Sequence, residues 1–142
     1  MKRTGVIASC VLVLIVSAAG ARKGPDAKGT ILRFYELRER TLDQRGTKQD
    51  VEQLLALFAP GGSYEHPGAG VVMNVEQARS GLLAHLGEGS NADFHFNQAR
   101  VNEDFAVVEV TLRYTVEGKL VNRRGVAVFE FKKGKIARLA EY

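Results

Sequence analysis

The sequence predicts an α+β domain in which three helices precede an antiparallel sheet. Helical spacing of apolar residues occurs before about residue 87, whereas the chain from residue 93 onward alternates between apolar and polar residues. The chain has 142 residues, of which 45% are apolar and 25% are charged, a composition typical of one folded domain with its own core. It contains no internal repeat and no low-complexity segment.

The N-terminus has the layout of a signal peptide. Lys2 and Arg3 form a basic start, an apolar run follows over residues 11–16, and small residues lead up to a cleavage point after Ala21. The segment is short for a membrane span, and a retained N-terminal anchor is the alternative. We therefore expect export to the periplasm or the medium. The expected organisation is a signal peptide over 1–21, a flexible lead-in over 22–29 and a domain over 30–142.

Charge and cysteine content argue against several kinds of partner. The formal net charge is +4, of which Lys2 and Arg3 contribute two, and the other basic residues are interleaved with acids instead of forming a stripe with stacking aromatics. We therefore expect no nucleic-acid binding. Cys10 is the only cysteine, so no internal disulfide is possible. Three widely spaced histidines form no metal motif, and no phosphate loop or nucleophile elbow occurs, so we expect neither a metal nor a cofactor.

Three segments have the helical spacing of apolar residues. The first begins at Thr30 and ends near Arg45, the second begins at Thr47, and the third begins after Asn74. Thr47 and Asn74 are each followed three positions later by an acidic or amide residue, as in a capping box. Pro60-Gly61-Gly62 is expected to end the second helix. The apolar stripes are Ile31, Phe34, Tyr35 and Leu42; Val51, Leu54, Leu55 and Phe58; and Val75, Ala78, Leu82 and Leu86.

The second half of the chain predicts four strands, over residues 93–101, 106–116, 121–131 and 135–142. The strand 106–116 alternates strictly, which indicates that one face is buried. The register of the hairpin before it decides where His95 points. With a two- or four-residue loop, Val101 pairs with Ala106, and His95 and Asn97 join the apolar face. With a three-residue loop, the register reverses, and His95 faces solvent. We favour the first register, which gives His95 and Asn97 a place in a pocket.

The best candidate site is the run from Gly62 to Pro67. Tyr64 and His66 share a parity, so their side chains point to one face of an extended segment. Pro67 favours an extended backbone at His66. A tyrosine and a histidine on a short strand beneath helices could form the polar floor of an apolar pocket.

Four segments of the chain carry a family resemblance. They are Leu57-Phe58-Ala59-Pro60-Gly61-Gly62-Ser63-Tyr64-Glu65-His66-Pro67, Val126-Ala127-Val128-Phe129-Glu130-Phe131, Gly134-Lys135-Ile136 and the closing Glu141-Tyr142. These segments resemble the nuclear transport factor 2-like superfamily, in particular its SnoaL-like and ketosteroid-isomerase-like members. The resemblance covers about residues 30–142. It implies a cone-shaped fold: a curved antiparallel sheet with three N-terminal helices packed on its concave face.

The resemblance also implies candidate chemistry. Ketosteroid isomerases carry an aspartate base where this chain has His66, and an imidazole can serve as a base near neutrality. Tyr64 could then donate a hydrogen bond to a developing oxyanion. Scytalone-dehydratase-like relatives use pocket histidines, and His95 with Asn97 resembles such a strand position. Tyr114, on the apolar face of the strand 106–116, completes the expected substrate-binding residues.

Two functions fit these features. The first is an exported domain that binds a small apolar organic ligand and acts as a cofactor-free isomerase, cyclase or dehydratase with His66 as base. The alternative is a non-catalytic ligand-binding or dimerisation module of the same fold, whose sheet face carrying Glu109, Thr111 and Arg113 meets a partner. We expect a homodimer in either case.

Overall fold

The computed structural model describes residues 26–142, in which three helices lie over a six-stranded sheet. The expected signal peptide over 1–21 lies outside these residues. No helix within them is both long and apolar enough to cross a bilayer. The elements are α1 (Ala27–Leu42), α2 (Lys48–Leu55), β1 (Phe58–His66), the 3₁₀ turn η1 (Pro67–Ala69), β2 (Val71–Asn74), α3 (Val75–Ala84), β3 (Ser90–Val101), β4 (Phe105–Val116), β5 (Lys119–Lys132) and β6 (Lys135–Glu141).

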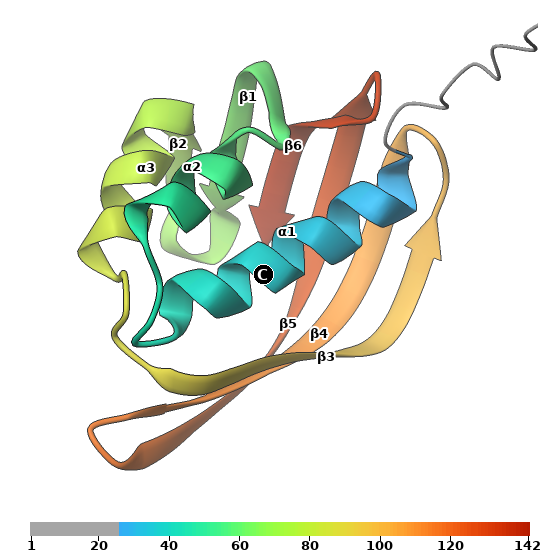
Figure 1. Ribbon diagram of the computed structural model, residues 1–142. Coiled ribbons are helices and arrows are strands. Elements are labelled where there is room, and N and C mark those ends of the chain that lie inside the picture. Colours follow the sequence, from blue (N-terminus) through green and yellow to red (C-terminus); the bar gives the residue numbers. More distant parts are fainter. Residues whose placement is uncertain (1–25) are drawn as a thin grey trace, which may run out of the picture.

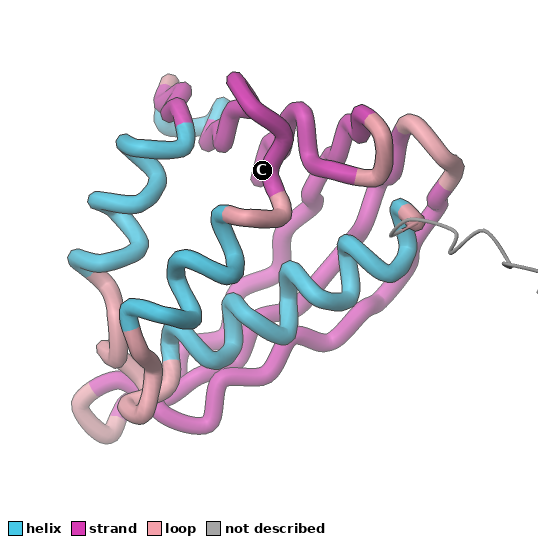
Figure 2. The backbone as a smooth tube through the Cα atoms, turned by 45° about the horizontal axis from the view of Figure 1, so that its top comes forward, coloured by secondary structure: helices cyan, strands magenta, loops and turns pink. Residues whose placement is uncertain are grey.

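The sheet is curved and open, with the strand order β2-β1-β6-β5-β4-β3. Figure 1 shows α1 running across its concave side, with α2 and α3 grouped near β1 and β2. The same arrangement is visible in the tilted view, where all three helices lie on one side of the sheet (Figure 2). The predicted α+β class is therefore confirmed. One pairing differs from the antiparallel expectation, since β1 and β6 run parallel.

The core is built around the aromatic side chain of Phe34 in the middle of α1. Its ring makes edge-to-face contacts with Tyr35, Phe58, Tyr64 and Phe129, with ring centroids 5.2 to 6.4 Å apart. All five side chains are buried. Such aromatic pairs each contribute about 0.5–1.5 kcal/mol beyond the area that they bury. The helix is thereby fixed against both β1 and β5.

The helix starts follow the capping signals. The capping boxes at Thr47 and Asn74 are both present, as predicted. Helix α1, however, begins at Ala27 instead of Thr30, because the Asp26 carboxylate accepts a hydrogen bond from the backbone N–H of Gly29. The last residues of the expected lead-in are thus helical.

Strand β1 begins earlier than the sequence patterns predict. Phe58, expected on the stripe of the second helix, is the first residue of the strand. The Pro60-Gly61-Gly62 segment is a bulge within β1, across which the pairing shifts from Phe58–Ile136 to Ser63–Arg138. Gly62 lies so close to β6 that a Cβ atom there would be 2.9 Å from the carbonyl oxygen of Ile136. Only glycine permits this approach. The short strand β2, which pairs with the end of β1, was not predicted.

A second bulge reverses the faces of β3. Val101 pairs with Ala106, which is the register that we favoured, but the pairing shifts between Phe96 and Gln98. On the N-terminal side of this bulge, Phe94 and Phe96 face inward, and His95, which is paired with Thr111, is exposed. The expectation that His95 and Asn97 line a pocket is therefore wrong. Counted from the hairpin, the extra residue in the bulge moves every side chain beyond it to the other face of the sheet.

Contacts with α1 explain this reversal. The rings of Phe94 and Phe96 lie 4.9 and 5.2 Å from that of Tyr35. The backbone N–H of Phe94 also donates to the carboxylate of Glu39 at 2.8 Å. Partial burial of two aromatic rings and pairing of a backbone donor favour the bulged register over a regular ladder.

Candidate functional site

A two-lobed cavity lies between the helices and the concave face of the sheet. One lobe, the helix lobe, has a volume of about 480 Å³ and is bounded by α1, α3 and parts of β1, β2 and β4. The other, the strand lobe, has a volume of about 500 Å³ and is bounded by β3 to β6 and the C-terminus. Four residues line both lobes, and we call them the waist: Arg38, His66, Leu112 and Arg123. The helix lobe is further lined by side chains that include Leu42, Tyr64, Met73, Leu82, His85 and Tyr114.

Tyr64 lies at the base of the helix lobe. The residue is 3% exposed, and its hydroxyl donates a hydrogen bond of 2.7 Å to Oε2 of Glu141. The parallel pairing of β1 with β6 sets Tyr64 opposite Leu139, so the end of β6 runs beside the end of β1. Burial and the neighbouring Glu141 carboxylate both raise the pKa of Tyr64 well above its ordinary value. The hydroxyl is therefore a proton donor over the physiological pH range.

His66 lies beside this pair, at the point where the two lobes meet. Its Nδ1 is 3.8 Å from the same Oε2 of Glu141, and its ring centroid is 5.0 Å from that of Tyr64. The imidazole is 40% exposed at the side-chain level, so one face is open to the cavity. One carboxylate oxygen thus faces both a phenol and an imidazole. Such an arrangement can accept a proton on the imidazole and balance the resulting charge with the carboxylate.

Helix α1 adds two polar groups that the sequence analysis did not single out. The hydroxyl of Tyr35 and Nε of Arg38 are both buried, and neither has a hydrogen-bond partner among the residues described. Burial, followed by the charge of Glu141, raises the pKa of Tyr35, whereas Arg38 acts to lower it. The same two charges act on Tyr64, which places all four groups in one electrostatic cluster.

The structure brings three of the predicted site residues together. Tyr64, His66 and Tyr114 all line the helix lobe. Tyr114 is held by close packing, since a Cβ atom at Gly89 would lie 2.8 Å from its ring. The other two predicted residues, His95 and Asn97, lie on the outer face of the sheet, where the Asn97 amide donates a hydrogen bond to the hydroxyl of Thr111 at 2.9 Å.

Glu141, Arg38 and Tyr35 were missed for a common reason: each lies on an element whose pattern indicates core packing. A signal existed at position 38, where an arginine interrupts the apolar stripe that runs from Tyr35 to Leu42. A charged residue on the buried side of a helix is costly unless it is paired or faces a cavity.

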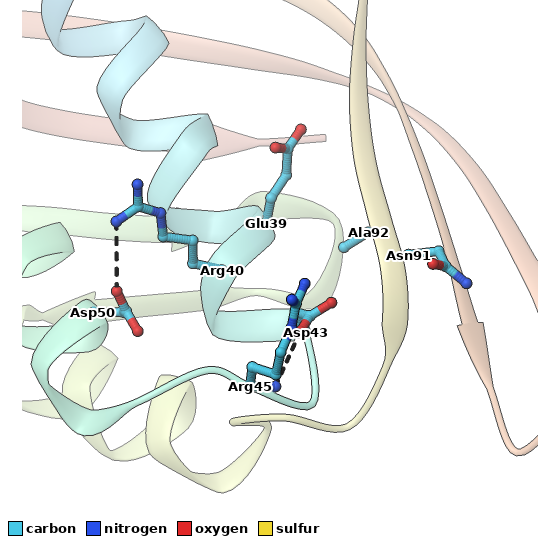
Figure 3. A pocket seen from close by; sticks show the side chains of 7 residues that line it. All are labelled: Glu39, Arg40, Asp43, Arg45, Asp50, Asn91 and Ala92. Atoms are coloured by element: carbon cyan, nitrogen blue, oxygen red, sulfur yellow. Dashed lines mark hydrogen bonds and ion pairs between the residues drawn. The ribbon is translucent and has the colours of Figure 1, made fainter.

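A second hollow, of about 450 Å³, lies between the end of α1 and the start of β3 (Figure 3). Arg40 faces Asp50 at 3.9 Å, and Arg45 pairs with Asp43 at 2.9 Å. The carboxylate of Glu39, which also lines it, accepts the hydrogen bond from the backbone of β3. All of these charged groups have protein partners. This second hollow, which we call the charged hollow, therefore offers a ligand few unpaired charged groups.

Within residues 26–142, no three histidine, cysteine or acidic side chains lie together as they would around a metal ion.

The SnoaL-like domain family matches residues 32–139. The chain belongs to this family. A comparison with curated proteins found no match. The match covers every element from α1 to β6, including all residues at the waist of the cavity, and it confirms the predicted membership of the nuclear transport factor 2-like superfamily.

Solved structures share the fold of this SnoaL-like domain at low sequence identity. An NTF2-like protein of unknown function from Burkholderia pseudomallei has 19% identity and a TM-score of 0.63, over 82% of this chain and 88% of that one. A candidate SnoaL-like polyketide cyclase from Jannaschia sp. CCS1 has 16% identity and a TM-score of 0.62, over 82% and 83%. TerC, co-crystallised with polyporic acid, has 19% identity and a TM-score of 0.62, over 82% and 89%.

Proposed function

We propose that this SnoaL-like domain binds a small organic molecule in the two-lobed cavity and catalyses a cofactor-free proton transfer on it. The reaction class is isomerisation, cyclisation or dehydration, in which a C–H bond next to a carbonyl is broken. One observation carries the proposal: Oε2 of Glu141 faces both the hydroxyl of Tyr64 and Nδ1 of His66, at 2.7 and 3.8 Å, on the wall of a cavity.

In the proposed mechanism His66 takes the proton from the substrate carbon, and the electron pair moves to the carbonyl oxygen. The imidazolium that forms is paired with the Glu141 carboxylate. This pairing releases the hydroxyl of Tyr64 from Glu141, and the hydroxyl then donates to the enolate oxygen. For isomerisation, His66 returns the proton to another carbon. For cyclisation, the enolate attacks a second carbonyl carbon, and the resulting alkoxide takes the proton from His66. For dehydration, the enolate expels a β-hydroxyl group, which takes the proton from His66 and leaves as water.

The relatives support a ligand of this kind. One protein of the same fold is described as a candidate polyketide cyclase, and TerC was co-crystallised with polyporic acid. The apolar part of the cavity wall, with Met73, Leu82 and Val110, suits a ring system more than a sugar or a nucleotide.

The test is proton exchange on a simple ketone. We expect the protein in D₂O to accelerate the loss of the α-proton signal of 2-tetralone in NMR spectra. The His66→Gln variant should lower the rate by about 10²-fold or more, as is typical for the loss of a general base, while binding changes little. His85→Gln is the matched control, because His85 lines the same lobe but pairs with Glu88 at 2.8 Å. Exchange that is equal in the His66 and His85 variants would remove His66 from the mechanism.

A ligand that binds without exchange of any α-proton would favour the alternative, a non-catalytic binding module. Polyporic acid is a direct probe for that outcome, with binding followed by isothermal calorimetry. The same NMR sample reports both results, because chemical-shift changes measure binding and signal loss measures exchange.

We also propose that the domain forms a homodimer through the outer face of the sheet. Val126 is 37% exposed there, beside Val107 and a shallow hollow of about 320 Å³. Glu109 of the same face pairs with Arg124. Light scattering should give the mass of a dimer, and Val126→Lys should shift it to that of a monomer. A monomeric mass for the unmodified chain would rule the dimer out.

A further inference from the structure

The waist of the cavity carries two arginines, Arg38 and Arg123, and the Glu141 carboxylate lies on the wall of the strand lobe. Among the ion pairs within residues 26–142, none involves Arg38 or Arg123, although both line the two lobes. Nε of Arg38 is buried without a partner. A buried guanidinium donor that lacks an acceptor is unfavourable by about 1–3 kcal/mol. Arg38 also lines both lobes, so an anionic ligand group there would form charge-assisted hydrogen bonds with its guanidinium.

The two arginines approach the waist from opposite sides. Arg38 extends from α1, and Arg123 lies on β5 directly across from Leu112 of β4, on the concave face. A planar guanidinium offers several donors in a fixed fork, which matches a carboxylate or an acidic enol better than a neutral carbonyl.

Apolar side chains form part of the cavity wall on each side of the waist. The strand lobe is lined by Phe94, Val110 and Ala127, and the helix lobe by Met73 and Leu82. With about 480 and 500 Å³, each lobe has the volume of a typical small-molecule site.

We infer that the ligand is an elongated organic acid, with its carboxylate or acidic enol held at the waist between Arg38 and Arg123 and its apolar ends in the two lobes. This inference rests on the proposed function, since it names the substrate class of the same cavity. It also gives the two arginines a role in specificity that is separate from the proton transfer assigned to His66.

The test compares two probes that differ only in charge, 2-naphthoate and 2-naphthamide. We expect NMR titration to show that the acid binds at least tenfold more tightly than the amide. Added salt should weaken the binding of the acid but not that of the amide. Arg38→Gln and Arg123→Gln should each reduce this preference to less than threefold. Arg113→Gln is the matched control, because Arg113 is exposed and lines neither lobe.

Three results would each overturn the inference that the arginines bind an acid group. Equal binding of the acid and the amide to the unmodified protein would overturn the inference, as would a preference that survives both arginine substitutions. Arg123 is exposed, so its variant is informative even if Arg38→Gln fails to fold. The His66→Gln variant should still prefer the acid to the amide. If this variant loses the preference, His66 and not the arginines binds the acid group, and the inference is overturned.

The two proposals fail separately. Proton exchange that depends on His66, together with equal affinities for acid and amide, would leave the proposed function in place and remove only the acidic substrate. Preference for the acid without any exchange would retain the anion site in a non-catalytic binding protein.

Discussion

The charged hollow of Figure 3 and the helix lobe have similar volumes, about 450 and 480 Å³, but differ in what their polar groups contact. In the charged hollow, Arg40, Asp43 and Asp50 are all paired within the protein. In the helix lobe and beneath it, Nε of Arg38 and the hydroxyl of Tyr35 have no partner among the described residues. An unpaired buried group is unfavourable in the free protein, whereas groups already paired within the protein offer a ligand no free donor or acceptor.

The hollows also differ in how closely they are tied to the core. Tyr64 forms both the wall of the helix lobe and part of the aromatic cluster around Phe34. The wall of the charged hollow consists of surface side chains, of which Arg45 is 91% exposed. Changes at the two places should therefore have very different effects on folding.

The largest expected effect follows from this difference. Tyr64→Ala should lower the free energy of unfolding by about 3–5 kcal/mol, because it leaves a cavity beside Phe34 and Phe58. Arg40→Ala in the charged hollow should lower it by about 0.5 kcal/mol, as expected for an exposed ion pair. Urea denaturation measures both values. Equal losses at the two positions would contradict the distinction between a core wall and a surface wall.

The next effect concerns stability at alkaline pH. The pKa values of Tyr35 and Tyr64 are raised in the folded state, mainly by burial. Their contribution is therefore fully present below pH 10, the unfolded value, and is lost as the pH rises further, because only the unfolded chain releases the protons. Each tyrosine should reduce the free energy of unfolding by about 1.4 kcal/mol per pH unit in that range.

The matched measurement is urea denaturation between pH 9 and 11.5 for the unmodified protein and the Tyr35→Phe/Tyr64→Phe double variant. The difference between the two slopes isolates the tyrosines from the lysines, which titrate in both proteins. We expect the two curves to be parallel near pH 9 and the double variant to show a slope smaller by up to about 2.7 kcal/mol per pH unit above pH 10. Curves that stay parallel above pH 10 would mean that the hydroxyls reach solvent.

The sequence allowed part of the site to be predicted, and the reason is local geometry. The shared face of Tyr64 and His66 depends only on strand parity and on the proline that follows. The capping boxes at Thr47 and Asn74 are likewise local, because each depends on one side chain and a backbone three residues away.

The remainder depends on tertiary contacts that no short window of sequence contains. The bulge in β3 forms because Phe94 and Phe96 pack on Tyr35, so the correct hairpin register still gave the wrong face for His95. Glu141 reaches the site only because β6 pairs in parallel with β1, across a separation of 77 residues from Tyr64. Parity could not reveal either arrangement.

A smaller difference in the free energy of unfolding at pH 7 is expected between variants of Tyr64, whose hydroxyl has a partner, and of Tyr35, whose hydroxyl has none among the described residues. Tyr64→Phe should lower the free energy of unfolding by about 1–2 kcal/mol, because it removes a hydrogen bond to the Glu141 carboxylate. Tyr35→Phe removes a hydroxyl that has no partner among residues 26–142, so stability should be unchanged or slightly higher. Thermal denaturation of the two variants gives the comparison. A larger loss for Tyr35→Phe would show that this hydroxyl is satisfied in solution and would weaken the case for a ligand there.

A gain in stability is expected at Gly81, where the helix lobe meets α3. A glycine inside a helix is unfavourable by about 0.5–1 kcal/mol relative to alanine, and a Cβ atom here would touch nothing within 4 Å. Gly81→Ala should therefore raise the free energy of unfolding by that amount. Gly81→Leu should retain the gain while its side chain occupies the helix lobe, so 2-naphthoate should bind at least tenfold more weakly.

The matched control for Gly81→Leu is Ala92→Leu, which narrows the charged hollow instead. If the helix lobe is the ligand site, only the substitution at Gly81 weakens binding, although it is the one that stabilises the helix. A glycine that lowers stability and keeps a cavity open is expected where the cavity is used. Binding that is lost in the Ala92 variant and retained in the Gly81 variant would move the ligand to the charged hollow and reverse the comparison.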